Sequence, residues 1–186
     1  MTKQNSYVMT AAKISGILLL ICACVAGVVS FVFSLTIDTY EANLAAEINN
    51  ALAGIFDVTE QDEFTSAVVE ETSEYILYEV NKNGEKSYCV QIPGEGFGGA
   101  MSIMVGYNPD KTISGVSVVS HAETPGIGSK ATAQAHLEQY EGKTGSLTIS
   151  KKAGESDVDA IGGATISSKA IHAAINRSNE IVGGLN

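Results

Sequence analysis

The sequence predicts an α+β fold, in which one N-terminal transmembrane helix precedes a single domain with an antiparallel sheet and flanking helices. Three patterns predict this arrangement. A charge-free apolar run occupies residues 14–37, and two pairs of β-rich segments joined by turn residues follow it. An apolar stripe at helical spacing lies near the C-terminus, at residues 165–182. The 186 residues allow one ordinary domain beside the membrane span.

The apolar run at residues 14–37 is long enough to span a membrane. At about 1.5 Å per helical residue it reaches roughly 36 Å, against about 30 Å for a hydrocarbon core. A cleaved signal peptide has a shorter stretch of about 7–15 residues, and the lipobox-like residues 21–24 are followed by further apolar residues. Lys3 and Lys13 precede the run, so the positive-inside rule predicts a cytoplasmic tail at residues 1–13 and an extracytoplasmic domain.

Charge and cysteine content exclude some classes of protein. The chain has 11 Lys and Arg against 21 Asp and Glu, a formal net charge of −10, which excludes a nucleic-acid binder because such proteins need a cationic surface. Cys22 and Cys24 fall inside the predicted span, and Cys89 stands alone in the domain. Neither a disulfide framework nor a metal site is therefore expected.

The remaining elements follow from local patterns. Asn83-Gly84 suits a type I′ turn between two strands, and a second strand pair surrounds residues 108–111. A helical stalk is expected over residues 38–58, and the domain then occupies 59–186. The other expected elements, in chain order, are a short helix at 59–69, strands at 75–80, 86–92, 101–107 and 113–119, a helix at 129–140, a strand at 146–150 and a helix at 165–182.

Two glycine-containing loops are candidates for a binding site. Residues 94–99 satisfy GxGxxG, but the residues after them have a strand pattern, which disfavours a dinucleotide site. They form either a flexible connection or a loop whose bare backbone approaches a ligand. Residues 120–130 lie between a strand and a helix and contain His121 and Glu123. An ordered turn and a binding loop both fit this second segment, and no nucleophilic triad can be assigned.

A third candidate lies at the start of the last helix. Gly162 and Gly163 let the backbone approach a ligand, while Thr165 and Ser167 supply hydroxyl groups. The helix N-terminus favours an anion such as phosphate, and Lys169 lies one turn further on. The alternative is that Thr165 merely caps the helix.

These segments resemble a known family. Asp159-x-x-Gly-Gly-Ala-Thr-x-Ser167 resembles the flavinylation motif of FMN-binding domains, with Gly162 where Ser or Thr is usual. His121-Ala-Glu-Thr-Pro-Gly-Ile-Gly128 resembles a segment shared by the G subunits of Rnf complexes and the C subunits of sodium-pumping NADH:quinone reductases. Residues 94–101 resemble the family's glycine-rich loop, which commonly contains Trp, whereas this chain has none.

The resemblance implies covalent FMN. Thr165 would carry it through a phosphoester made by a flavin transferase, and the ring would lie against the loop at residues 121–128. The implied cofactor-binding residues are Thr165, Gly162, Gly163, Ala164, Ser167, Glu123, Thr124, His121 and Lys169. No residue is expected to act as a catalytic acid or base, because the flavin itself carries the electrons.

The resemblance also implies a place in a larger assembly. The chain would be a single-pass electron-transfer subunit of an Rnf-type complex in the cell membrane, which couples electron flow from reduced ferredoxin to NAD with Na⁺ or H⁺ translocation. Other membrane subunits would be its partners and would hold the NAD and ferredoxin sites. The alternatives are a C subunit of a Na⁺-translocating NADH:quinone reductase, a stand-alone extracytoplasmic flavoprotein reductase, and a membrane-tethered binding or scaffold domain without flavin.

Overall fold

The computed structural model describes residues 2–152 and 154–185. The chain divides into two compact units, Met1–Ala46 and Glu47–Asn186. The ends of the predicted cytoplasmic tail and of the predicted domain, residues 1 and 186, lie outside the described residues.

The first unit is helical. Helix α1 (Thr2–Ile55) starts in this unit and ends in the second. Its stretch Lys13–Ile55 is long and apolar enough to cross a membrane, with an 18-residue window of mean hydropathy 2.8, and side chains 13–36 are exposed. The predicted apolar helix is confirmed, and the expected stalk is helical as far as Ile55.

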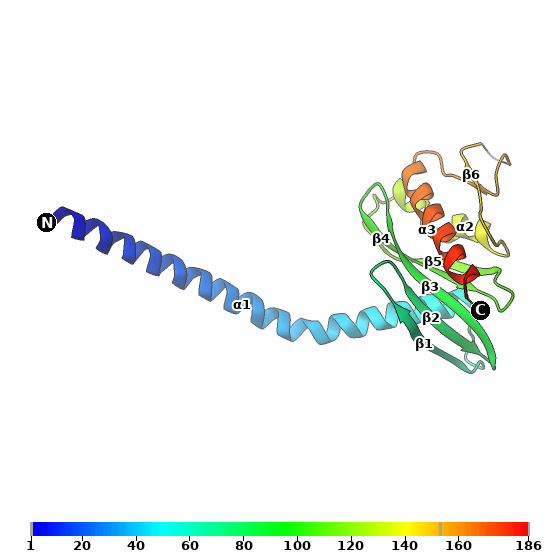
Figure 1. Ribbon diagram of the computed structural model, residues 1–186, viewed down its shortest axis with the longest axis horizontal. Helices are drawn as coiled ribbons and strands as arrows, with labels where there is room; N and C mark the ends of the chain where they lie inside the picture. Colours follow the sequence, from blue (N-terminus) through cyan, green and yellow to red (C-terminus); the bar gives the residue numbers. More distant parts are fainter. Residues whose placement is uncertain (1, 153, 186) are drawn as a thin grey trace. The chain divides into compact units, whose positions relative to one another are not determined.

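The second unit contains a five-stranded antiparallel sheet in the order β1-β2-β3-β4-β5 (Figure 1). Each strand pairs with its neighbour in sequence, because short turns join them. Asn83 (φ 54°) and Gly84 (φ 87°) both adopt positive φ angles between β2 and β3, so the predicted type I′ turn is confirmed. The strands are β1 (Phe64–Glu71), β2 (Ile76–Lys82), β3 (Glu85–Glu95), β4 (Ala100–Tyr107) and β5 (Ile113–His121).

The prediction of a short helix at residues 59–69 is wrong. Residues from Phe64 onward form β1, which pairs with β2 from Phe64↔Lys82 to Glu71↔Ile76. The adjacent β-branched residues Val68 and Val69 favour extended backbone. Pairing with β2 also satisfies backbone groups that a short helix on the surface would leave to water, so the sheet gains a fifth strand.

The predicted helix at residues 129–140 is also only partly correct. Ala133 is extended (φ −69°, ψ 139°) and interrupts it. The segment divides into a 3₁₀ turn at Gly128–Lys130, helix α2 at Gln134–Leu137 and a 3₁₀ turn at Glu138–Tyr140. The predicted strand at 146–150 shortens to β6 (Ile149–Ser150), which pairs in parallel with β7 (Val158–Asp159).

Both faces of the sheet are covered. Helix α3 (Thr165–Gly183) packs against β3 and β4 on one face, as Figure 1 shows, through a core that includes Ile103, Val105 and Ile171. The other face receives the end of α1, where Leu52, Ile55 and Phe56 pack against a second core cluster. Alternation along β4 allows this, since successive side chains point to opposite faces.

Polar contacts hold both covering helices in place. Lys82 Nζ donates to the carbonyl oxygens of Phe56 (2.7 Å) and Asp57 (2.9 Å), just past the end of α1. Tyr107 Oη on β4 donates to Asn179 Oδ1 on α3 at 2.8 Å. Burial raises the pKa of Tyr107, so its hydroxyl stays protonated and able to donate. These contacts fix α3, and with it the backbone at the helix start.

Candidate functional site

A cavity of about 460 Å³ lies at the start of α3. Its lining comes from four segments that are distant in sequence: the glycine loop before β4, the loop after β5, the residues after β6, and the start of α3. The lining residues are Phe97, Glu123, Thr124, Ile127, Gly128, Lys151, Gly163, Ala164, Thr165, Ile166 and Ser167. Six of the nine residues that the sequence singled out are therefore brought together around one space.

The other three residues that the sequence singled out lie outside this lining. His121 ends β5 with an exposed side chain, and its Nδ1 accepts a hydrogen bond from the backbone N–H of Glu123 at 3.2 Å. It therefore shapes the loop on which Glu123 stands. Gly162 lies in the turn before α3, and Lys169 is exposed on the helix itself.

The helix start offers unpaired backbone donors. The residue preceding α3 is Ala164 (φ −121°, ψ 29°), whose methyl side chain makes no capping hydrogen bond. Thr165 is thus the first helical residue rather than the cap, which removes the structural alternative for this residue. The first backbone N–H groups of a helix lack partners within the helix, so this end of the cavity favours an anion.

Two buried polar side chains in the cavity lack hydrogen-bond partners within the described chain. Glu123 is only 5% exposed, and neither carboxylate oxygen has a partner. Ser167 Oγ on α3 is fully buried and also unpaired. Leaving such groups unsatisfied is costly, and nearly all buried polar atoms in proteins are paired. Both residues line the cavity, so a polar ligand there would satisfy them.

Glycines bring the loops around Glu123 together. A Cβ atom added at Gly96 or Gly128 would overlap the Glu123 carboxylate, and one at Gly98 would overlap the backbone carbonyl of Ala122. Residue 100 begins β4 rather than a helix, so the GxGxxG pattern is not a dinucleotide fingerprint here. Its glycines instead allow close packing against the loop after β5.

The cavity has an apolar edge that the sequence reasoning missed. Phe97 (75%), Ile127 (57%) and Ile166 (55%) are exposed although they are large and apolar. All three line the cavity. Each of the three lies inside a segment that the sequence analysis singled out. A large apolar residue within each of these glycine-containing segments is the sequence feature that could have pointed to the apolar edge. An apolar edge beside a polar helix end suits a ligand with one flat apolar part and one anionic part.

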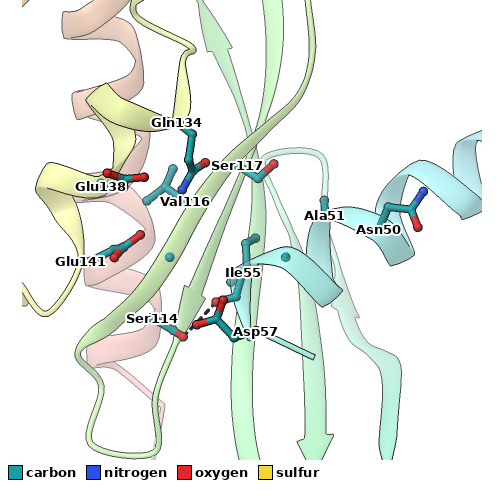
Figure 2. Close-up of a pocket in the computed structure, with 12 residues that line it drawn as sticks. Asn50, Ala51, Ile55, Asp57, Ser114, Val116, Ser117, Gln134, Glu138 and Glu141 are labelled. Atoms are coloured by element: carbon teal, nitrogen blue, oxygen red, sulfur yellow. Dashed lines mark hydrogen bonds between the residues drawn. The ribbon is translucent and has the colours of Figure 1, made fainter. Parts of the chain in front are cut away.

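A second cavity of about 450 Å³ lies beside β5, as Figure 2 shows. Asp57, Glu138 and Glu141 contribute carboxylates to it, while Ser114 Oγ donates to the Ile55 carbonyl oxygen at 3.1 Å. None of the predicted site residues lies there. Because three carboxylates repel a phosphate group, an anionic ligand favours the cavity at α3.

The metal-ligating residue types and the thiol of the domain can be described individually. Within residues 2–152 and 154–185 no group of three or more His, Cys, Asp or Glu side chains is placed to hold a metal ion. Cys89 is fully buried, and burial raises the pKa of its thiol, so it stays protonated.

Part of the chain matches a known family. Residues 96–180 match the model of the family described as FMN-binding domain. The match spans a little under half of the chain and includes every residue that lines the cavity at α3.

The curated relatives are G subunits of ion-translocating complexes. The chain is 35% identical over 105 residues to the G subunit of the proton-translocating ferredoxin:NAD(+) oxidoreductase complex of Clostridium ljungdahlii, covering 54% of this chain and 57% of the relative. It is 33% identical over 112 residues to the Na(+)-translocating counterpart from Acetobacterium woodii, covering 56% and 54%. The chain thus spans a little over half the length of these relatives.

Among solved structures, the chain is similar to the C subunit of the Na(+)-translocating NADH-quinone reductase from Parabacteroides distasonis. It is 21% identical, with a TM-score of 0.49 over 62% of this chain and 73% of that one.

Proposed function

We propose that the protein is a membrane-anchored electron carrier that holds FMN covalently at Thr165. One observation carries the proposal. The residues that match the FMN-binding family enclose a cavity in which Thr165, the start of α3 and two unpaired buried polar side chains meet. The residues fit the group: the helix N-terminus suits its phosphate, and the exposed apolar edge suits its ring.

Attachment to Thr165 requires an activated flavin nucleotide as donor. The hydroxyl oxygen of Thr165 would form a bond to the flavin-side phosphorus of a flavin dinucleotide, and the phosphoanhydride bond would break. A nucleoside monophosphate would leave, and the hydroxyl proton would pass to solvent. A flavin transferase would position the donor, while the protein supplies the hydroxyl of Thr165, which is not the N-cap residue of α3.

The protein's own residues would bind and orient the group. The Glu123 carboxylate would accept hydrogen bonds from polar atoms of the flavin nucleotide, and Ser167 Oγ would donate or accept one. These bonds would remove the cost of leaving the two buried side chains unpaired. Phe97 and Ile127 would contact the ring and keep water from one of its faces. When bound, the flavin supplies one- and two-electron transfer.

We further propose that the carrier works within an Rnf-type complex, relaying electrons between other membrane subunits while ferredoxin and NAD bind elsewhere. The names of the relatives support this placement. Helix α1 would cross the membrane once, and the Lys residues before it together with the acidic domain after it favour a cytoplasmic N-terminus and an extracytoplasmic domain. Covalent attachment would then retain the flavin outside the cytoplasm.

The experiment is to co-express the full chain with a flavin transferase and examine it on a denaturing gel under ultraviolet light, with intact-mass measurement. The wild-type chain is expected to fluoresce and to carry the added mass of one FMN phosphoester. Thr165→Ala is expected to be dark and unmodified.

The matched control is Thr144→Ala, because Thr144 is exposed and lies outside the cavity. This variant should fluoresce like the wild type. A dark wild-type chain, with the transferase active on a known acceptor, would refute the flavin assignment and favour the tethered binding domain. If Thr165→Ala still carries the label, FMN is attached to a residue other than Thr165.

A further inference from the structure

Two adjacent lysines, Lys151 and Lys152, follow β6 and have different surroundings in the structure. Lys152 Nζ lies 3.3 Å from Glu155 Oε1 in an exposed ion pair. Lys151 instead lines the cavity at α3, together with Gly163 and Thr165. Within residues 2–152 and 154–185, Lys151 has no carboxylate within ion-pair distance. Both lysine side chains are exposed, but Lys152 is paired with Glu155, whereas Lys151 belongs to the lining of the cavity.

The charge around the cavity makes this position distinctive. Glu123 and Lys151 are the two charged residues in the lining. From residue 38 onward the chain carries 9 Lys and Arg against 21 Asp and Glu, so an anionic ligand approaches a strongly negative domain. Lys169, the cation nearest to Thr165 along the chain, is exposed and outside the lining. Among the lining residues, Lys151 is therefore the one cation.

Independent features of the cavity point to a bound ligand. Ser167 Oγ and both Glu123 carboxylate oxygens are buried and unpaired among the described residues, and both residues line the same space as Lys151. Because Lys151 lines the cavity together with the helix N-terminus, the ligand that these two features fit carries a phosphate group.

We propose that Lys151 is a phosphate-binding residue of this site, which neutralises the phosphate of the flavin nucleotide and stabilises the phosphodiester once it is formed on Thr165. The inference rests on the proposed function. Its chemistry is a charge-assisted contact between an ammonium group and phosphate oxygens, so it depends on the cation and tolerates Arg. The covalent step itself is unchanged, and Lys151 exchanges no proton in it.

The first test measures the rate at which the purified full chain in detergent acquires flavin from a flavin dinucleotide and transferase. Lys151→Gln should lower this rate about tenfold, in keeping with the loss of one charged hydrogen bond. Lys151→Arg and Lys152→Gln should stay within about twofold of the wild type. Lys152→Gln is a matched control, since it removes an equal charge at the adjacent position.

The second test excludes an effect on the transferase alone. The thermal midpoint is measured for labelled and unlabelled forms of the wild type, Lys151→Gln and Lys152→Gln. Lys151→Gln should leave the unlabelled midpoint unchanged and reduce the rise that labelling produces, while Lys152→Gln should alter neither.

The outcomes separate the two proposals. A wild-type chain that takes no label refutes the proposed function and the inference with it. A labelled wild type with an equally labelled Lys151→Gln refutes the inference alone. Equal losses in Lys151→Gln and Lys152→Gln refute it too, since overall loop charge would then be the cause. Lys151→Gln could also acquire flavin more slowly and yet show the same rise in thermal midpoint on labelling as the wild type. That result would assign Lys151 to recognition by the transferase and would overturn the phosphate contact.

Discussion

Gly98→Ala should damage the packing that forms the cavity. A Cβ atom at Gly98 would overlap the carbonyl oxygen of Ala122 and lie 2.8 Å from both the carbonyl carbon of Ala122 and the Cα of Glu123. Ordinary contact begins at 3.4 Å, so the two segments must separate by more than 0.6 Å. These atoms belong to backbone, which cannot rotate away as a side-chain tip does. Overpacking of this kind typically costs about 1–3 kcal/mol, or very roughly 2–12 °C in thermal midpoint for a domain of this size.

The assay is urea unfolding of the full chain in detergent, followed by tyrosine fluorescence because the protein has 7 Tyr and no Trp. The control is Gly183→Ala, since a Cβ atom at Gly183 on α3 meets nothing within 4 Å. The control should have the wild-type free energy of unfolding or one up to about 1 kcal/mol larger, because Ala favours helix over Gly. If Gly98→Ala unfolds together with the control, the glycine loop does not pack against Ala122 as described.

Three further predictions concern stability and reactivity. Lys82→Met should destabilise the protein by about 1–2 kcal/mol, because Lys82 donates to two carbonyl oxygens after α1. Lys86→Met should cost less than Lys82→Met, since the ion pair of Lys86 is exposed, and urea midpoints of the two variants compare these costs. Burial lowers the pKa of His172 below its unfolded value of about 6.5, so the unfolded chain binds the proton first and stability should fall as the pH drops below about 6.5. Urea midpoints measured between pH 8 and 5.5 should depend less on pH in His172→Gln than in the wild type. Parallel curves for the two proteins would contradict this role of His172. With Cys22 and Cys24 replaced by Ala, the thiol of Cys89 should resist a disulfide reagent until urea unfolds the chain, and rapid labelling of the folded protein would show that this strand is not buried.

Local chemistry predicted much of the sheet. Asn83-Gly84 supports a type I′ turn in almost any context, because both residues tolerate positive φ angles, and the strands on either side followed from it. Residues 59–69 lacked such a signal. Their backbone conformation depends on β2, whose outer edge needs a partner, so a local reading of the segment led to the wrong element.

The helix at residues 129–140 failed for a different reason. Its apolar residues fit helical spacing, but Ala133 is extended. The buried side chains of His136, Leu137 and Tyr140 are placed by contacts with distant parts of the domain, and Tyr140 Oη lies 3.4 Å from His172 Nδ1 on α3. Packing of this kind overrides a local preference for continuous helix.

The candidate site divides in the same way. The segments around Glu123 and Thr165 were found from residue type and spacing, because glycines, hydroxyls and a helix start carry their chemistry locally. Lys151 and Lys169 could not be ranked by sequence, since nearness to Thr165 along the chain favours Lys169. In the structure both lysines are exposed, and Lys151 lines the cavity whereas Lys169 does not.

The long apolar helix, the antiparallel strand pairs and the chemical groups available for a ligand could be predicted from the amino-acid sequence. Those features depend on composition, on turn chemistry and on periodicity, which act over a few residues. In contrast, the folded domain was needed to show that the loops near Gly98, Glu123, Lys151 and Thr165 enclose one cavity, and that Ala164 rather than Thr165 is the N-cap residue of α3. The physical reason is that burial and long-range packing place these segments, and neither is written in the spacing of neighbouring residues.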